Sequence, residues 1–336
     1  MTRALLLAAG LGTRLGKLSL ERPKPLFPVA DIPLIRYAIA LLRGHGITEI
    51  AINLHHQADL ITRELGDGRS SGVNIVYSHE PEILGTGGGI FKLREFLTQE
   101  GHESFFVVNA KILIDVNLAE VRALHERHDA VATLVLKQAA DAARWGAIEV
   151  DGAERVTRIL DEGTPGEHRS MFTGVHLLTP RFVATLPGGT SDSIRHGYLP
   201  ALKRGDRICG QLLPGYFHEH STPERYLEGN WNVLDGRATL GYPPGQMHGV
   251  SASATVAAGA ELRDPVRIGD GAVVESGARL GPLVVVGHGA RVRPGVSLER
   301  TVVWPNIDVT SSLSDAIVTP ETIFQLPKGD QHGRQT

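Results

Sequence analysis

A six-residue period near the carboxyl end constrains the fold of this chain more than any other feature. Aliphatic side chains recur at every sixth position from Val250 to Leu298, and a small apolar residue follows four positions after each of them. Nine consecutive hexads obey both rules. Such hexads predict a parallel β-helix, in which each repeat forms one short flat side and its leading aliphatic residue points inward. The alternative is an irregular β-domain rich in glycine turns, and the unbroken run argues against it.

The repeat fades after Leu298, because Trp304 and Thr310 occupy the next leading positions. Upstream of the repeat, the stretch YPPGQM is rich in proline and predicts a joint. The last residues are polar, and we expect them to be disordered. The predicted segments are a first domain at 1–236, a linker at 237–249, the β-helix at 250–318 and a polar tail at 319–336.

Before residue 236, short apolar strands alternate with helical stretches, which predicts a mainly parallel, doubly wound Rossmann-like α/β sheet. The continuous apolar run Ala4–Ala9 is typical of a strand covered on both faces. The stretch Trp145–Leu160 predicts a hairpin that turns at Asp151-Gly152 and belongs to an antiparallel extension. Asp115 is expected to cap a helix. Strands are expected at 4–9, 48–54, 73–78 and 105–108, and helices at 33–46, 58–65, 90–97 and 116–128.

Composition excludes several classes of protein. The 336 residues are 42% apolar and 21% charged, and the formal net charge of -3 gives no footprint for a nucleic acid or a membrane surface. No stretch approaches the roughly 20 apolar residues of a membrane span. The single cysteine, Cys209, excludes an internal disulfide framework and favours a cytoplasmic location.

A glycine loop follows the first strand directly, in the stretch LAAGLGTRLGKLSLERPKPLFPV. Backbone N–H groups beside Gly10 and Gly12 can cradle phosphate oxygens, because glycine lets a ligand approach the chain closely. The loop lacks the Gly-Lys-Ser/Thr of a P-loop, and Leu15 stands where a dinucleotide fingerprint needs its third glycine. Two cations remain on the loop, Arg14 and Lys24, and this arrangement suits a triphosphate.

This stretch resembles the sugar-1-phosphate nucleotidyltransferase family, whose pattern is roughly L-A-A-G-x-G-T-R-L followed by P-K-P-L-x-P-V. The resemblance covers most of the chain and implies a GT-A-like nucleotidyltransferase domain followed by a left-handed β-helix with three hexads per turn. The stretches INLHHQADLI and YSHEPEILGTGGGIF look most like mannose-1-phosphate or heptose-1-phosphate guanylyltransferases. The N-acetylmuramate-1-phosphate uridylyltransferases share a similar Thr-Gly-Gly-Gly segment, so the base stays open.

The resemblance implies transfer of a nucleotidyl group from a nucleoside triphosphate, with GTP favoured, to a sugar 1-phosphate, with mannose 1-phosphate favoured. The sugar phosphate oxygen would attack the α-phosphorus in line, and pyrophosphate would leave. This reaction requires two anions to be aligned and their repulsion to be screened, by cations and usually by Mg²⁺. The flat faces of the β-helix are expected to mediate assembly into a homo-oligomer.

The same resemblance assigns expected roles to single residues. Lys24 would contact the α-phosphate, and Arg14 would act with it as a catalytic cation. We expect Lys111 to be a third catalytic cation because of its own charge, since the family has an aspartate at that position. The nucleotide-binding residues would be Ala8, Gly10, Gly12, Thr13, Glu80, Gly85, Thr86, Gly87 and Asn109. The sugar-binding residues would be Gly146, Glu162 and Gly174. The family has a lysine after the hairpin, and the stretch LDEGTP lacks it.

Lys111 stands where the family has an aspartate that holds a catalytic metal, and Glu219 stands where a second metal-binding aspartate is expected. A Mg²⁺ cofactor is in doubt for that reason. In a first interpretation, the Lys111 ammonium replaces the charge of the metal and Glu219 still holds a metal with the nucleotide phosphates. In a second, the chain is a non-catalytic, nucleotide-sugar-binding regulatory or assembly protein in which Lys111 and Glu219 form a salt bridge. In a third, Asp115 or another carboxylate takes the metal. We favour the first.

Two histidine motifs have simpler structural interpretations. On a predicted strand, the imidazoles of His218 and His220 face one side and the Glu219 carboxylate faces the other, which argues against a three-ligand metal site. His288 is the candidate base for an acyl transfer, and an exposed loop histidine is the simpler interpretation. Thr222 predicts the start of a helix as its capping residue.

Overall fold

The computed structural model describes residues 2–99, 103–139, 142 and 146–327. The chain forms two compact units that do not follow one another in sequence. Unit 1 comprises Met1–Leu11, Ile35–Phe217 and Leu240–Tyr242, and unit 2 comprises Gly12–Leu34, His218–Thr239 and Pro243–Thr336. Unit 2 therefore contains the β-helix region together with two segments from much earlier in the chain. The linear boundaries expected at residues 236 and 249 stay a prediction.

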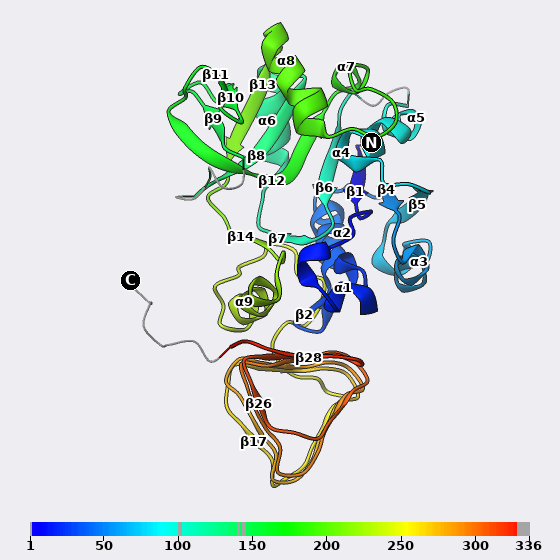
Figure 1. The fold of residues 1–336 in the computed structure, drawn as a ribbon, viewed down its shortest axis with the longest axis vertical. Coiled ribbons are helices and arrows are strands. Elements are labelled where there is room, and N and C mark those ends of the chain that lie inside the picture. Colours follow the sequence, from blue (N-terminus) through cyan, green and yellow to red (C-terminus); the bar gives the residue numbers. More distant parts are fainter. Residues whose placement is uncertain (1, 100–102, 140–141, 143–145, 328–336) are drawn as a thin grey trace. The chain divides into compact units, whose positions relative to one another are not determined.

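Unit 1 is built on a mixed β-sheet (Figure 1). Its strands and one further short strand are β1 (Arg3–Leu7), β4 (Glu49–Leu54), β5 (Asn74–His79), β6 (Phe105–Asn109), β7 (Ile112–Ile114), β8 (Ala132–Gln138), β9 (Ile148–Val150), β10 (Val156–Ile159), β11 (Glu162–Gly163), β12 (His168–Leu178) and β13 (Ile208–Leu212). The order is β11-β10-β9-β12-β6-β1-β4-β5, and β8 pairs with both β12 and β13. Neighbours among β6, β1, β4 and β5 run parallel, whereas β12 is antiparallel to β6, β8 and β9. The antiparallel extension is therefore present as predicted.

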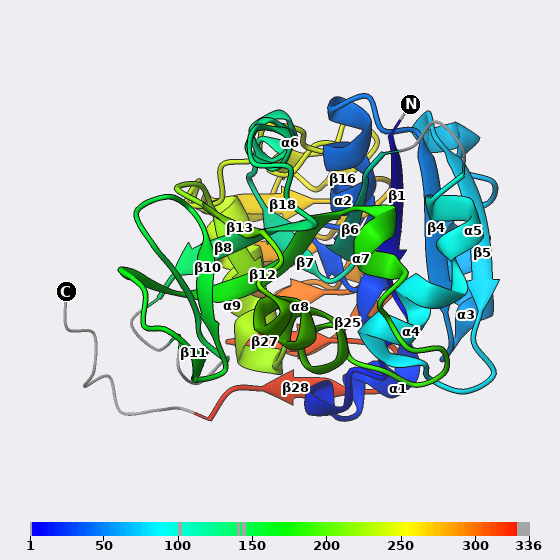
Figure 2. The same cartoon turned by 90° about the horizontal axis from the view of Figure 1, so that it is seen from above.

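Helices cover both faces of this sheet. They are α2 (Leu34–Gly44), α3 (Ala58–Leu65), α4 (Gly85–Lys92), α5 (Arg94–Leu97), α6 (Leu118–Arg127), α7 (Pro180–Val183) and α8 (Leu199–Arg204). Side chains alternate across each strand, so Leu5, Ala51 and Val107 point to one face, where they pack in a core with Ile90 and Leu97 of α4 and α5. Figure 2 shows α2 and α6 on one side of the sheet and α4 and α8 on the other. The predicted α/β class is confirmed.

Two local predictions for unit 1 are wrong. The helix expected at 90–97 begins at Gly85, so the glycine run lies in the first turns of α4 rather than in a loop. Asp115 does not cap α6, because the side chain of Asn117 accepts the N–H of Ala119 at 3.1 Å. The Asp115 carboxylate instead accepts the backbone N–H of Gly241 at 3.2 Å.

The expected hairpin between β9 and β10 is antiparallel, as predicted. Its connection is longer than a two-residue turn and spans residues 151–155. The carboxylate of Asp151 stabilises this connection, because its Oδ1 accepts the N–H groups of Ala153 and Arg155, both at 2.9 Å. An aspartate that satisfies the backbone of its own turn is a common local device.

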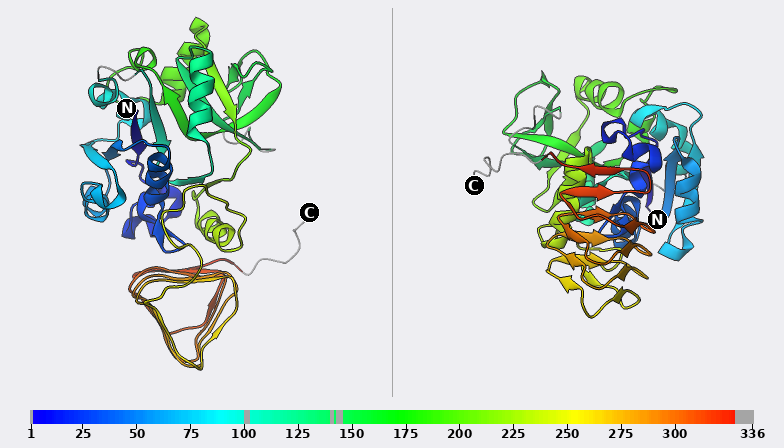
Figure 3. Two further views of the ribbon diagram at one scale, coloured as in Figure 1. Left: turned by 180° about the vertical axis from the view of Figure 1, so that it is seen from behind. Right: turned by 60° about the horizontal axis from the view of Figure 1, so that its bottom comes forward.

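The carboxyl-terminal part of unit 2 is a three-sided coil of short strands, seen end-on in Figure 1 and as stacked arrows on the right of Figure 3. The strands are β15 (Gly249–Val250), β16 (Thr255–Val256), β17 (Glu261–Leu262), β18 (Val266–Ile268), β19 (Val273–Val274), β20 (Arg279–Leu280), β21 (Val284–Val286), β22 (Arg291–Val292), β23 (Ser297–Glu299), β24 (Val302–Val303), β25 (Asp308–Val309), β26 (Leu313–Ser314) and β27 (Ala316–Val318). Val266 pairs with Val284 in parallel, so one turn of the coil takes 18 residues, or three hexads. The predicted β-helix is confirmed.

The apparent end of the repeat at Leu298 is a frame shift. Val286 pairs with Val303, an offset of 17 residues instead of 18, so Val303 takes the inward position that the six-residue count assigns to Trp304. The coil then continues to Val318. It is followed by β28 (Ile323–Gln325), which pairs antiparallel with β27. The polar tail expected at 319–336 includes β28 and its bounds stay a prediction, while its last residues, 328–336, lie outside the described residues.

The two earlier segments of unit 2 contribute α1 (Leu18–Glu21), β2 (Pro28–Val29), β3 (Ile32–Pro33) and α9 (Pro223–Leu234). The strand β14 (Phe217–Glu219) begins at the last residue of the preceding unit 1 segment. As predicted, Thr222 caps α9, and its side chain accepts the N–H of Arg225 at 3.3 Å. Within the part of the chain that the structure describes, we find no helix of the length and apolar character that crossing a membrane would require.

Candidate functional site

Three strands of unit 1 end at a chain of buried hydrogen bonds. The N–H of Ala8, after β1, donates to Asn53 Oδ1 at 2.8 Å, and Asn53 Nδ2 donates to Glu80 Oε1 at 2.8 Å. The other carboxylate oxygen of Glu80 accepts the N–H of Leu84 at 3.0 Å, just before α4. Asn53 and Glu80 are each 3% exposed. Glu80 therefore ties the carboxyl ends of β1, β4 and β5 to the start of α4.

Asn53 is a residue that the sequence interpretation missed. It is a polar residue within the otherwise apolar strand IAINL, and a buried amide there needs partners on both sides. That pattern is the signal that could have identified it. Because both carboxylate oxygens of Glu80 accept hydrogen bonds from the chain itself, its expected contact with a nucleotide stays a prediction.

The glycine run at the start of α4 packs closely against the segment that precedes α8. A Cβ atom at Gly85 would lie 2.5 Å from the carbonyl oxygen of Ser191, and one at Gly87 would lie 2.7 Å from the Ser191 hydroxyl. The N–H of Gly87 donates to the Ser191 carbonyl at 2.9 Å, and the Thr86 hydroxyl donates to Ser193 Oγ at 3.0 Å. Close packing within the protein thus explains these glycines, and their contact with a nucleotide stays a prediction.

Gly10 differs from every other described glycine. Apart from Gly10 itself and its two neighbours in the chain, no described residue has an atom within 4 Å of the position that a Cβ would take at Gly10, and its φ lies outside the left-handed region. The other described glycines with equally open surroundings all have a positive φ. Neither packing nor backbone conformation requires a glycine at residue 10. The close approach of a ligand to the backbone would require one.

Two more predicted residues of unit 1 meet at the end of β6. Gly174 of β12 has a φ of 85°, and a Cβ there would lie 2.0 Å from Asn109 Nδ2, so the asparagine side chain rests on the glycine. Lys111 follows in the turn between β6 and β7 and is half-buried. Glu219 belongs to unit 2, so the pairing of Lys111 with Glu219 that one interpretation requires stays a prediction.

The other two expected sugar-binding residues lie in the antiparallel extension. Gly146 has a φ of 81°, and a Cβ there would lie 2.6 Å from the Leu160 side chain. Glu162 is exposed on β11 and forms an ion pair with Lys203 of α8, at 2.6 Å between Nζ and Oε2. Their contact with a sugar stays a prediction.

The phosphate-binding residues expected after Gly10 lie in unit 2. Gly12 adopts a left-handed conformation with a φ of 66° and precedes the short 3₁₀ helix Thr13–Leu15, in which Thr13 and Arg14 are exposed. Lys24 begins a second 3₁₀ helix, Lys24–Leu26, after Pro23. The loop is therefore a series of tight turns rather than a long helix, as the sequence predicts.

Lys24, which is buried, and Glu219, which is half-buried, form an ion pair. Their Nζ and Oε1 atoms are 3.7 Å apart, and the side chains are only 6% and 15% exposed. The structure thus brings together the expected phosphate contact and the expected metal ligand. No local sequence signal predicts this contact, because the two residues belong to motifs far apart in the chain.

The described residues do not fit a metal held by the protein alone. Among them, no group of three or more His, Cys, Asp or Glu side chains is arranged to hold a metal ion. Glu219 has a cationic partner in Lys24. His218 is buried, which lowers its pKa, and its Nε2 lies 2.7 Å from the carbonyl oxygen of Arg225. The metal role of Glu219 and the Mg²⁺ cofactor stay predictions.

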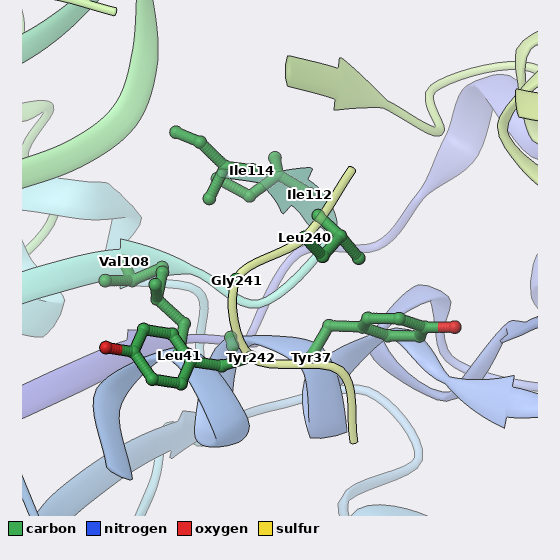
Figure 4. Close-up of a pocket in the computed structure, with 9 residues that line it drawn as sticks. Tyr37, Leu41, Val108, Ile112, Ile114, Leu240, Gly241 and Tyr242 are labelled. Carbon is green, nitrogen blue, oxygen red and sulfur yellow. The ribbon is translucent and has the colours of Figure 1, made fainter. Parts of the chain in front are cut away.

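A small apolar pocket in unit 1 lies where the chain returns from α9 (Figure 4). Its cavity volume is about 10 Å³, which is room for roughly one water molecule and too little for a nucleotide or a sugar. The Tyr242 ring packs edge-on against His45 with ring centroids 4.9 Å apart, which anchors this part of the expected linker to unit 1. The lining residues are Tyr37, Ala38, Leu41, Val108, Ile112, Ile114, Leu240, Gly241 and Tyr242.

Residues 3–178 match the protein family described as nucleotidyl transferase. Over 237 residues the chain is 28% identical to the mannose-1-phosphate guanylyltransferase of Mycobacterium tuberculosis, covering 70% of this chain and 65% of that protein. It is 27% identical over 231 residues to the mannose-1-phosphate guanyltransferase of Schizosaccharomyces pombe, covering 68% of this chain and 63% of that protein. The matched region thus spans less than two thirds of these relatives.

Solved structures of similar fold cover the same part of the chain. HddC from Yersinia pseudotuberculosis, in complex with GMP-PN, superposes with a TM-score of 0.56 at 22% identity, covering 68% of this chain and 98% of that one. A putative glucose-1-phosphate thymidylyltransferase from Bacillus anthracis superposes with a TM-score of 0.59 at 20% identity, covering 68% of this chain and 94% of that one. At these identities the likeness shows the shared fold.

Proposed function

The chain belongs to the nucleotidyl transferase family, and from this membership we propose that it transfers a nucleotidyl group from a nucleoside triphosphate to a sugar 1-phosphate. GTP and mannose 1-phosphate are the favoured substrates, because the relatives that align with about 70% of the chain are named mannose-1-phosphate guanylyltransferases. The products are a nucleotide sugar and pyrophosphate.

The observation that carries this proposal is the open space around Gly10. This residue follows the first strand, at the carboxyl edge of the parallel part of the sheet, where ligands bind in open α/β folds. Its side-chain position is empty, and its backbone conformation suits any residue. A glycine without a structural reason supports the interpretation that a phosphate group passes close to the backbone there.

In the proposed reaction, an oxygen of the sugar phosphate attacks the α-phosphorus of the triphosphate. The bond from the α-phosphorus to the bridging oxygen breaks, and pyrophosphate leaves with the electron pair. The cations expected to screen the repulsion between the two anions are Arg14, Lys24 and Lys111. Lys24 forms an ion pair with Glu219, and in the proposed reaction the α-phosphate replaces this carboxylate as the partner of Lys24.

A second candidate is a nucleotide-binding regulator without catalysis. The buried pair of Lys24 and Glu219 favours it, because this pair engages both the expected phosphate contact and the expected metal ligand. Lys111 in place of the family's aspartate also favours a regulator without catalysis. Both candidates share nucleotide binding and differ in turnover.

One assay separates them. Pyrophosphate release is measured with GTP, UTP, CTP and ATP against mannose 1-phosphate and other sugar phosphates, each with Mg²⁺ and with EDTA. The proposal expects turnover with at least one pair, and turnover that survives EDTA shows that Lys111 replaces the metal's charge. Tight nucleotide binding without turnover for any pair overturns the enzyme and leaves the regulator.

Glycine variants test whether the open space at Gly10 serves a bound nucleotide. Gly10→Ala should leave the free energy of unfolding unchanged, because its new methyl group meets no described atom, and should weaken nucleotide binding at least tenfold. Gly205→Ala is the control, since Gly205 ends α8 with a φ of 78°. This control should lower the stability by about 1 kcal/mol and leave nucleotide binding unchanged. Equal nucleotide affinity in Gly10→Ala and the native chain contradicts a phosphate beside residue 10.

A further inference from the structure

The segment Gly12–Leu34, called here the phosphate-binding segment because it contains Lys24, packs against the β-helix through an aromatic cluster. Phe27 lies three residues after Lys24, and its ring packs against Tyr226 of α9 and Trp304 of the β-helix, with centroid distances of 5.3 and 5.1 Å. Trp304 Nε1 donates to the Tyr226 hydroxyl at 3.0 Å, and that hydroxyl donates to the carbonyl oxygen of Pro28. All three rings are fully buried.

Two polar contacts hold the same segment at its ends. Asp31 Oδ1 accepts the backbone N–H of His288 at 2.9 Å and lies 3.1 Å from the Nδ1 atom of that residue. Glu21 accepts a hydrogen bond from the Thr319 hydroxyl at 2.7 Å and another from the N–H of Glu321 at 3.2 Å. Hydrogen bonds to carboxylates are among the stronger ones in proteins.

The β-helix carries a local adaptation to this segment. By register, Gly269, Gly287 and Trp304 occupy equivalent places in successive turns, each directly after an inward residue. A Cβ at Gly269 would lie 2.3 Å from Asp31 Oδ2 and 2.6 Å from the backbone nitrogen of His288, so a glycine here admits both the aspartate and the next turn of the coil. The frame shift before Trp304 brings a large ring to the third place, where Phe27 packs.

The clamp consists of Asp31, Tyr226 and Trp304, and both partners of the buried ion pair are attached to it. Lys24 precedes Phe27 in the segment that the clamp holds, and Glu219 leads into α9, which carries Tyr226. We infer that the β-helix positions the phosphate-binding segment, and that the three clamp residues are positioning residues for Lys24. The inference rests on the proposed function only in taking Lys24 as a phosphate contact. A displacement of about 1 Å at such a contact can cost roughly 100-fold in rate.

The test compares clamp variants with a control in the same β-helix. Tyr226→Phe keeps the ring and removes the hydroxyl that contacts Pro28 and Trp304. Asp31→Gly removes the carboxylate, and glycine keeps the φ of 69° without strain. Val274→Ala is the control, because Val274 lies in the β-helix core, away from the segment, and its truncation destabilises the coil alone.

Two measurements are made on each full-length variant. One is the rate at which an amine-acylating reagent labels Lys24 without nucleotide, followed by mass spectrometry. The other is the Kd of the nucleotide that the native chain binds best among the four assayed. The clamp variants should label Lys24 at least about fivefold faster and raise the Kd by roughly 3- to 10-fold, as for the loss of a hydrogen bond. Val274→Ala should lower the melting temperature and change neither quantity.

The inference is overturned if labelling and Kd in the clamp variants follow melting temperature alone and match those of Val274→Ala. If one clamp variant fails to fold, the other still decides. A native chain that binds no nucleotide, but whose Lys24 labelling still rises in the clamp variants, refutes the proposed function and leaves the positioning role intact.

Discussion

Neutralising Glu219 should expose how much the buried ion pair with Lys24 contributes. The variant Glu219→Gln keeps the size of the side chain and removes its charge beside the lysine ammonium. At a separation of 3.7 Å, two unit charges interact by about 4.5 kcal/mol at an effective dielectric constant of roughly 20. Breaking one side of a buried pair typically costs about 3–5 kcal/mol, because a buried charge loses its compensation. Without nucleotide, we expect the free energy of unfolding to fall by about 3 to 4 kcal/mol.

The assay is urea unfolding of the full chain at pH 7, with and without nucleotide. A double-mutant cycle with Lys24→Met isolates the pairwise energy. Lys24→Met/Glu219→Gln should recover most of the stability, because it removes both charges. In Glu219→Gln, a phosphate no longer competes with the carboxylate for Lys24, so nucleotide should stabilise this variant more than the native chain.

The reasoning is refuted if Glu219→Gln loses less than about 1 kcal/mol and the double variant is no more stable than Glu219→Gln. A carboxylate whose main task is to hold a metal predicts a different pattern. In that case Glu219→Gln weakens nucleotide binding when Mg²⁺ is present and leaves binding in EDTA unchanged.

Four further outcomes are expected. The double variant Lys111→Asp/Glu219→Asp should release pyrophosphate only when Mg²⁺ is present. If this double variant turns over equally in Mg²⁺ and in EDTA, Lys111 does not replace the metal in the native chain. Burial lowers the pKa of His176 to about 3, so the stability that its neutral form contributes is complete above pH 6.5 and is lost as the pH falls. Relative to His176→Gln, the native chain should therefore lose up to about 1.4 kcal/mol per pH unit between pH 6 and 4 in urea unfolding, and parallel profiles would contradict the burial of this imidazole. Gly89→Ala should cost about 1–3 kcal/mol of unfolding free energy, because its Cβ would lie 2.9 Å from Asn53 Nδ2. Light scattering should give a mass above 36.2 kDa for an oligomer, and a monomer at micromolar concentration would refute self-association.

Periodic features could be predicted from the sequence because they depend on neighbours along the chain. The hexads predict a parallel β-helix, and the alternation of strands with helices predicts the doubly wound sheet. The six-residue count ends at Leu298 because the next repeat is one residue shorter. The strands still pair across this shorter repeat, since Val286 pairs with Val303, so the coil continues. The sequence predicts Asp115 as a helix cap, and this prediction is wrong because the partner of Asp115, Gly241, lies far along the chain.

The glycines also show which features the sequence predicts and which features depend on contacts in the folded chain. Sequence reasoning treated Gly10 and the run from Gly85 to Gly89 alike, as loops that approach a ligand. The structure separates them, because Gly87 packs against Ser191 and Gly89 against Asn53, whereas Gly10 has open space. Only the atoms around a glycine decide whether it serves packing or a ligand.

The sequence by itself determined the two kinds of repeating architecture and the motif that carries Arg14 and Lys24, because each is written in local spacing, and the resemblance to the family rests on that motif. The tertiary structure alone decided that Lys24 rests on Glu219 and that the segment around it is clamped to the β-helix by Asp31 and Trp304. These contacts join residues that are remote in the chain, and burial and geometry select them. Local periodicity contains no information about such pairs, so they appear only when the chain is folded.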